Sequence, residues 1–139
     1  MTSRALFRAE RLLESARGVR PVLGIDTSSP IARLALVADG RVAACVSRRT
    51  RSHAAELADA VAELLGSSDL GFTDLGAVAV AIGPGSFTGL RIGISYAKGL
   101  AVASGCALVG VPSLDCIALA ARASPGGGES LICAVVDAR

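Results

Sequence analysis

Hydrophobic and polar positions follow a strand pattern near the start of the chain. Residues 22–26 (VLGID) form a short apolar run that ends in an aspartate. Residues 31–37 (IARLALV) and 41–47 (RVAACVS) follow, and Asp39-Gly40 between them is a strong signal for a two-residue hairpin turn. The pattern therefore predicts three consecutive strands, of which the second and third form a hairpin.

The period becomes helical from residue 54 onward. Ser52 is a suitable N-cap and Gly66 a suitable C-terminal stop for a helix over residues 54–65. Its apolar residues recur at helical spacing, at Leu57, Val61, Leu64 and Leu65. Strands and helices then alternate. Strands are predicted at 77–82 and 107–111, one helix runs from the loop 83–89 to Ser104, and Ser113 is the predicted N-cap of another helix that ends at Ala123.

This order predicts an α/β fold with a mixed five-stranded sheet and helices on its faces. Right-handed crossovers place the first and fourth strands side by side and parallel. The carboxyl ends of these two strands carry Asp26, Thr27 and Ser28 and the segment 83–86 (GPGS). We therefore expect two motifs that are far apart in the sequence to meet in one crevice.

The last part of the chain repeats an earlier pattern. After the loop 124–130 (SPGGGES), residues 131–137 (LICAVVD) form an apolar run that ends in an aspartate, as residues 22–26 do. Either this run opens a second lobe, or it is an edge strand that completes the first sheet. The first interpretation divides the chain into an N-terminal extension at 1–20, a lobe at 21–124 and the start of a truncated second lobe at 125–139. We expect the extension to be dispensable for folding.

Composition narrows the class of protein. Apolar residues make up 52% of the 139 residues and charged residues 19%, which excludes a disordered solvating chain. One Tyr, three Phe, no Trp and a net charge of +2 argue against a nucleic-acid platform. No uncharged run reaches the ~18 residues of a membrane span. Four cysteines without C-x-x-C spacing and one histidine do not suggest a zinc site, and the cysteines fit a reducing cytoplasm.

The glycine-rich turn at 83–93 (GPGSFTGLRIG) leads from a buried strand into a helix. Free backbone N–H groups at such a turn suit an anion, so Gly83, Gly85 and Ser86, together with Asp26, Thr27 and Ser28, are candidates for a vestigial phosphate site. The turn is not a Walker A loop, because Leu90 follows the last glycine of its GSFTG stretch where that motif has lysine. The alternative is that the glycines only permit tight packing and that Asp26 begins an Asx turn.

Small residues recur every four positions along the helix that follows this turn, at Gly89, Gly93, Ala97 and Ala101. Such a row permits close backbone approach either by a partner helix or by the chain's own sheet. The spacing alone leaves both alternatives open. The apolar residues of the preceding helix, Leu57, Val61 and Leu64, face the same choice between core and interface.

Five segments resemble one family in order and in sequence: LGIDTS (23–28), SHAAEL (52–57), GPGSFTGLRIG (83–93), GVPSL (110–114) and VVDAR (135–139). Together they span residues 22–139 and are similar to the TsaB (YeaZ) family. The resemblance implies a ribonuclease-H-like lobe of the actin-like/Hsp70-like (ASKHA) superfold. It also implies a cytoplasmic role in making threonylcarbamoyladenosine at position 37 (t6A37) of tRNA.

In that family the related TsaD subunit transfers the threonylcarbamoyl group, a TsaE-type ATPase assists, and TsaB is a non-catalytic dimerisation subunit. The resemblance thus implies no catalytic residue, no metal and no required cofactor here, although ATP or ADP is compatible with a subunit interface. It implies contact with tRNA only through the complex, no contact with membranes, and either a TsaD-type partner or a homodimer. It favours an interface formed by Leu57, Val61, Leu64, Gly89, Gly93, Ala97 and Ala101.

Two other functions compete with this one. An ASKHA-type ATPase or phosphotransferase would use Asp26 and the segment 83–86 on the phosphates of a nucleotide. A metallopeptidase would need a metal-binding histidine pair, and these 139 residues contain only His53. We therefore expect neither peptidase nor significant ATPase activity.

Overall fold

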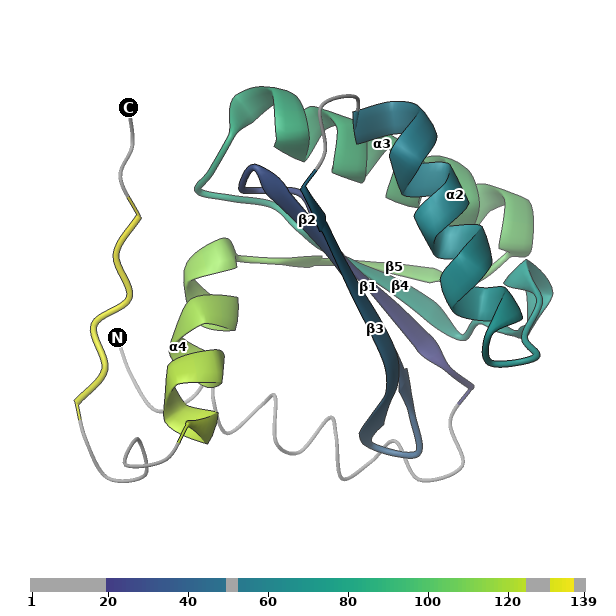
Figure 1. Cartoon of the computed structure of the whole chain (residues 1–139), viewed down its shortest axis with the longest axis horizontal. Coiled ribbons are helices and arrows are strands. Elements are labelled where there is room, and N and C mark those ends of the chain that lie inside the picture. Colours follow the sequence, from purple (N-terminus) through teal and green to yellow (C-terminus); the bar gives the residue numbers. More distant parts are fainter. Residues whose placement is uncertain (1–19, 50–52, 125–130, 137–139) are drawn as a thin grey trace.

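A mixed five-stranded sheet organises the molecule, in a computed structural model that describes residues 20–49, 53–124 and 131–136. The strand order is β3-β2-β1-β4-β5 (Figure 1). The strands are β1 (Val22–Asp26), β2 (Ile31–Ala38), β3 (Arg41–Arg49), β4 (Ala77–Ala81) and β5 (Ala107–Val111). All five predicted strands of the sheet are confirmed, with ends that differ by one or two residues.

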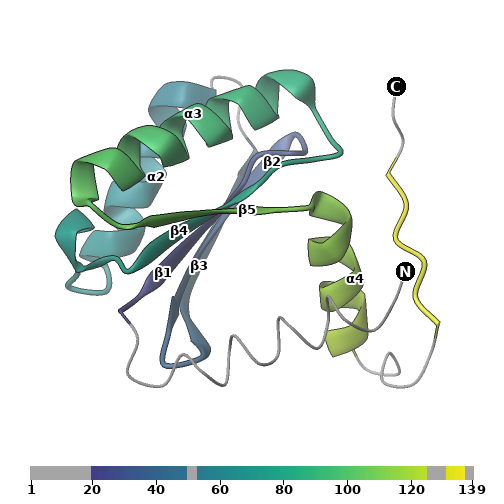
Figure 2. The same cartoon turned by 180° about the vertical axis from the view of Figure 1, so that it is seen from behind.

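Helices lie on both sides of this sheet. Figures 1 and 2 show α2 (His53–Gly66) and α3 (Phe87–Ser104) together over one face, and α4 (Ser113–Ala123) on the other side, beyond the end of β5. A short 3-10 helix (Phe72–Asp74) precedes β4. The α/β fold class is confirmed.

The pairing pattern positions the candidate site. Strands β1 and β2 are antiparallel, as are β2 and β3, whereas β1 and β4 pair in parallel from Val22↔Ala77 to Ile25↔Val80. The predicted adjacency of the first and fourth strands is thus confirmed. Asp39 and Gly40 both have positive φ, at 50° and 72°, which is the backbone that a type I′ hairpin turn requires.

The core lies between the sheet and the helices α2 and α3, and it is aliphatic. Leu23, Leu36 and Val78 from the sheet are fully buried, as is Val61 from α2. Burying a side chain of this size contributes about 1.5–3 kcal/mol. The side of the sheet that carries α4 lacks a comparable helical layer among the described residues (Figures 1 and 2).

The helix boundaries differ from the prediction at all three N-termini. Helix α2 begins at His53, one residue before its predicted start. Helix α3 begins at Phe87, inside the predicted loop, because the Ser86 side chain accepts a hydrogen bond from Gly89 N and caps the first turn. Helix α4 begins at Ser113 with Pro112 as N-cap, so Ser113 is a helical residue and not the cap. The C-terminal stop of α3 is confirmed, since Gly105 adopts the left-handed conformation at φ 69°.

The strand predicted at residues 131–137 is not formed within 131–136, which carry no ladder pairing. The interpretation as an edge strand of the first sheet is therefore wrong for these residues. The predicted extension at 1–20 lies outside the described residues, except for Arg20. Within the described part of the chain, none of the helices has the length and apolar character needed to cross a bilayer.

Candidate functional site at the carboxyl ends of β1 and β4

The two predicted motifs meet at the carboxyl ends of β1 and β4. Ser86 N donates a hydrogen bond to Ser28 O at 2.7 Å, which joins residues that are 58 positions apart. Asp26 Oδ1 accepts from Ser28 N at 2.9 Å and forms an Asx turn. The predicted convergence is confirmed, and one carboxylate oxygen of Asp26 is engaged with its own backbone.

Thr27 anchors the first turns of α3 to β1. Its side chain is buried, and its Oγ1 donates a hydrogen bond to Gly89 O at 2.8 Å. Because this hydroxyl is enclosed by the protein and already donates, it is a poor group for holding a phosphate. Thr27 therefore acts in the structure as the contact between strand and helix.

The glycines of the turn are also explained by close packing against the end of β1. A Cβ at Gly85 would lie 2.5 Å from Ser28 O, a Cβ at Gly89 would overlap Thr27 O, and a Cβ at Gly93 would overlap Thr27 Oγ1. Each glycine is thus required by close approach of β1 to the turn and helix. The packing alternative accounts for these positions without a ligand, and the phosphate site stays a prediction.

Gly83 lies in the same crevice and connects it to α4. Ser113 N donates to Gly83 O at 2.8 Å. The Ser113 side chain is 3% exposed, and its Oγ has no hydrogen-bond partner among the described residues. Sequence reasoning gave Ser113 only the role of a cap and missed this contact, because the spacing carries no signal that α4 returns to the turn after β4.

Cys116 lies one helical turn beyond Ser113, and the pKa of its thiol is raised. Partial burial raises the pKa of its thiol, and the negative charges of Asp26 and Asp115 raise it further. The bond from Ser113 N to Gly83 O holds the start of α4 at this crevice. Among the described residues there is no group of three or more His, Cys, Asp or Glu that could hold a metal ion.

The small-residue row of α3 faces the chain's own sheet. Gly89, Gly93, Ala97 and Ala101 are all buried, and Ala97 is 0% exposed. Their burial agrees with the alternative that the row packs within the chain, and Thr27 lies against Gly89 and Gly93. The interface at these four residues stays a prediction. The small side chains bring α3 close enough for Thr27 to reach the carbonyl of Gly89.

The predicted interface residues of α2 are also buried within the chain, and their role in an interface stays a prediction. Leu57, Val61 and Leu64 are at most 4% exposed and belong to the hydrophobic core. Their helical spacing marks the face of α2 that packs on the sheet. Within the described residues, both helices direct these side chains into the chain's own core.

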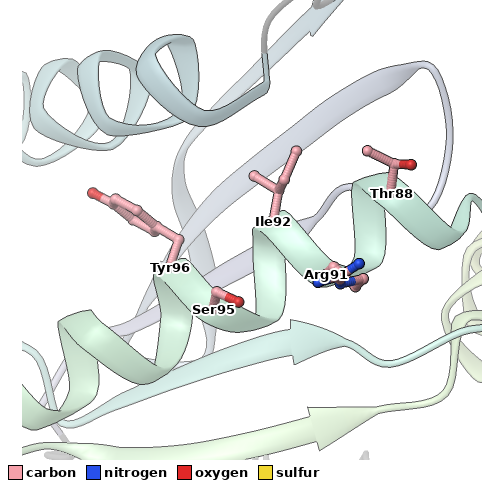
Figure 3. Close-up of a pocket in the computed structure, with 5 residues that line it drawn as sticks. All are labelled: Thr88, Arg91, Ile92, Ser95 and Tyr96. Atoms are coloured by element: carbon pink, nitrogen blue, oxygen red, sulfur yellow. The ribbon is translucent and has the colours of Figure 1, made fainter.

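A shallow hollow of about 420 Å³ lies along α3, and two of its lining residues, Ile92 and Tyr96, also pack against the core. Figure 3 shows the five side chains that line it, Thr88, Arg91, Ile92, Ser95 and Tyr96, along successive turns of the helix. The Arg91 guanidinium lies over the Phe87 ring, 5.4 Å from its centroid. Partial burial raises the pKa of the Tyr96 phenol, so that this side chain is neutral at physiological pH.

Comparisons with known proteins agree on one family. The model of the family described as "TsaD: tRNA N6-adenosine threonylcarbamoyltransferase" matches residues 46–139. The tRNA threonylcarbamoyladenosine biosynthesis protein TsaB of Escherichia coli is 37% identical over 118 residues, which are 85% of this chain and 50% of that protein. TsaB of Bacillus subtilis is 36% identical over 119 residues, with the same shares of the two chains.

A solved structure gives the same result for the fold. YeaZ from Pseudomonas aeruginosa superposes with a TM-score of 0.69 at 32% sequence identity, over 75% of this chain and 48% of that one. The sheet with its helices is thus a lobe of the actin-like (ASKHA) superfold. The chain belongs to the TsaB (YeaZ) family. It spans about half the length of the curated relatives that it matches.

Proposed function

We propose that the chain is a non-catalytic scaffold subunit in the biosynthesis of threonylcarbamoyladenosine in tRNA. The observation that carries this proposal is the 37% identity to the Escherichia coli protein TsaB over 85% of this chain. The packing roles of Thr27, Gly89 and Gly93 support it, because the residues that most resemble a phosphate loop are used to join a helix to a strand.

The partner in this proposal is a TsaD-type threonylcarbamoyltransferase, assisted by a TsaE-type ATPase, in the cytoplasm. A homodimer is the form expected in the absence of that partner. The net charge of +2 supports contact with tRNA through the complex and not through a basic surface of this chain. The scaffold role requires no cofactor in this chain, and ATP or ADP would belong to the interface between subunits.

The partner would bind the outward faces of α2 and α3. Two apolar side chains on α3 are strongly exposed, Phe87 at 74% and Val102 at 83%. The hollow at Thr88, Arg91 and Ser95 lies between them along the helix. Exposed apolar groups around a hollow that contains an arginine and a tyrosine are typical of a protein-binding surface.

A matched pair of valine substitutions tests this surface. Val102→Arg on α3 should weaken binding to a TsaD-type subunit about tenfold or more, because a buried charge without a partner is costly at an interface. Val42→Arg on β3, where the valine is 63% exposed, should leave the affinity unchanged. Calorimetry gives both affinities, and a thermal melt of each variant shows that the fold is intact. Equal affinity of the Val102→Arg variant and the wild type would refute the proposed surface.

The non-catalytic role has its own test. The pure chain should release phosphate from ATP at no more than the background rate, and Asp26→Ala should not change that rate. Enzyme-like hydrolysis that Asp26→Ala abolishes would replace the scaffold proposal by the ATPase alternative. Addition of the chain to a TsaD-type subunit should raise threonylcarbamoyl transfer to tRNA, and failure to do so would contradict the scaffold role.

A further inference from the structure

The two helices that cover one face of the sheet carry charges of opposite sign. The charged residues of α2 are Glu56, Asp59 and Glu63, and all three are acidic. Helix α3 carries Arg91 and Lys98 and has no acidic residue. A helix face that serves only for contact with solvent usually mixes both signs. A helix with one sign of charge suits a partner surface of the opposite sign.

Both cations of α3 belong to one exposed row on that helix. Its members recur at alternating intervals of three and four residues: Thr88, Arg91, Ser95, Lys98 and Val102. The row lies on the side of α3 opposite the buried small residues that pack on the sheet. Alternating intervals of three and four are the spacing at which two helices meet when they pack side by side. The row is therefore long enough to contact another helix over about four turns.

The row differs in shape and polarity from an ordinary solvated helix face. Apolar side chains lie near both of its ends, since Phe87 is 74% and Val102 is 83% exposed. Between these ends the surface is hollowed at Thr88, Arg91 and Ser95 (Figure 3). Exposed apolar groups that flank a concave centre mark a contact surface.

Arg91 is positioned to receive an anion in this hollow. Its guanidinium lies over the Phe87 ring, and a stacked guanidinium keeps the N–H groups of its edge free for a carboxylate. The ion pair found among the described residues joins Arg48 to Glu63. Within that part of the chain, therefore, no carboxylate lies within 4 Å of either cation of α3.

We propose that this row receives an acidic helix of the TsaD-type partner, on which two carboxylates seven residues apart pair with Arg91 and Lys98. The two cations are themselves seven residues apart, which is about 10 Å along α3. Side chains one heptad apart on a helix packed alongside therefore meet both cations. The inference rests on the proposed function and adds the side chains that select the partner.

A second copy of the chain is a poorer complement for this row. On the described helices, the acidic residues spaced by seven are Glu56 and Glu63 of α2. Glu63 already pairs with Arg48, and Glu56 is half-buried. A partner helix with two free carboxylates loses no existing ion pair when it binds.

Charge reversal tests the pairing with the TsaD-type subunit. Arg91→Glu and Lys98→Glu should each raise the dissociation constant about tenfold or more, because like charges then face each other across the contact. Added salt should weaken binding of the wild type more than binding of the double variant Arg91→Gln/Lys98→Gln, because salt screens charge pairs. Arg41→Glu, at the exposed start of β3, changes the net charge equally and should leave the affinity unchanged. Calorimetry gives the affinities, and thermal melts show that each variant is folded.

Cross-linking identifies the facing carboxylate directly. Lys98 is the only lysine among the 139 residues. A carbodiimide should therefore join Lys98 Nζ to an aspartate or glutamate of the bound partner through an amide bond. Mass spectrometry of the linked peptides should place that acidic residue on a helix of the partner. Lys98→Arg keeps the charge but lacks the amine, so this control should bind normally and give no such link.

The outcomes separate this proposal from the proposed function. Binding that neither charge reversal weakens, or a link from Lys98 to a residue outside a helix, would overturn the acidic-helix proposal and leave the scaffold function intact. Absence of any binding to the TsaD-type subunit would refute both. Self-association that the reversals weaken, with unchanged affinity for the TsaD-type subunit, would overturn the proposal and assign the row to a second copy.

Discussion

Thr27 shows how one residue links the end of a strand to a helix that begins sixty positions later. Its buried hydroxyl donates to Gly89 O, and its side chain occupies the space that a Cβ at Gly93 would need. A threonine after β1 and glycines on α3 therefore form a single packing unit. This unit accounts for the glycines at the start of α3. By sequence alone, these glycines fit a phosphate-binding turn and tight packing equally well.

Two glycine substitutions on α3 separate packing from helix propensity. Gly93→Ala should lower the free energy of unfolding by about 1–3 kcal/mol, because the new Cβ overlaps Thr27 Oγ1 in a close-packed contact. Gly99→Ala, where a Cβ meets no atom within 4 Å, should raise it by about 0.5–1 kcal/mol through helix propensity. Urea unfolding of both variants gives the values. A stable Gly93→Ala variant would show that β1 and α3 are further apart than described.

Cys116 reports on the electrostatics of the crevice. Burial and the charge of Asp26 both raise the pKa of its thiol, so neutralising Asp26 should lower that pKa and increase the thiolate fraction at a fixed pH. Alkylation of Cys116 should therefore be faster in Asp26→Asn than in the wild type. Mass spectrometry of the Cys116 peptide resolves this site from the other cysteines. Asp59→Asn on α2 is the control and should leave the rate unchanged.

At the scale of elements, the sequence pattern predicts which helices and strands exist and in what order they occur. The helical spacing of Leu57, Val61 and Leu64 and the apolar run at Ala77–Ala81 are local signals, and the structure confirms the helix and the strand. The prediction placed the first turn of α3 in the loop 83–89, because glycines favour a loop. In the structure the Ser86 side chain accepts a hydrogen bond from Gly89 N and caps a helix that already begins at Phe87.

The direction in which the small-residue row faces could not be predicted from its spacing. A Gly or Ala at every fourth position indicates that another backbone approaches the helix closely, but it does not indicate which backbone. The answer depends on Thr27 and on the parallel pairing of β1 with β4, both of which are tertiary features. The apolar run at residues 131–136 predicted a strand, but these residues form no ladder in the structure. The reason is related, because a strand forms only where a neighbouring strand supplies its hydrogen bonds.

A substitution in the middle of this row measures the packing of the whole helix. Ala97→Leu should lower the free energy of unfolding by about 1–3 kcal/mol, because Ala97 is 0% exposed and the added atoms have no space. Ala103→Leu, at an exposed position of the same helix, should be nearly neutral. Thermal melts compare the two, and affinity for a TsaD-type subunit is measured alongside. A weakened affinity with an unchanged melt for Ala97→Leu would restore the row as an interface.

At the scale of the whole molecule, the core that the structure describes comes from one continuous part of the sequence. Among the described residues, the buried hydrophobic ones run from Leu23 to Ala101. Helix α4 is attached to the crevice by the bond from Ser113 N to Gly83 O. Arg20 belongs to this unit, because its guanidinium donates to the carbonyls of Thr73 and Asp74 beside the 3-10 helix. These contacts attach Arg20 to the lobe.

A shortened chain of residues 20–124 should therefore fold cooperatively and melt within a few degrees of the full chain at low protein concentration. It keeps every buried residue of the core and both contacts of Arg20. A chain of residues 21–124 is the matched control and should melt slightly lower, because an exposed side-chain hydrogen bond contributes about 0.5–1.5 kcal/mol. Differential scanning calorimetry measures both. Loss of a cooperative transition in the 20–124 chain would show that the terminal segments stabilise the lobe and would contradict the predicted division at residues 20 and 124.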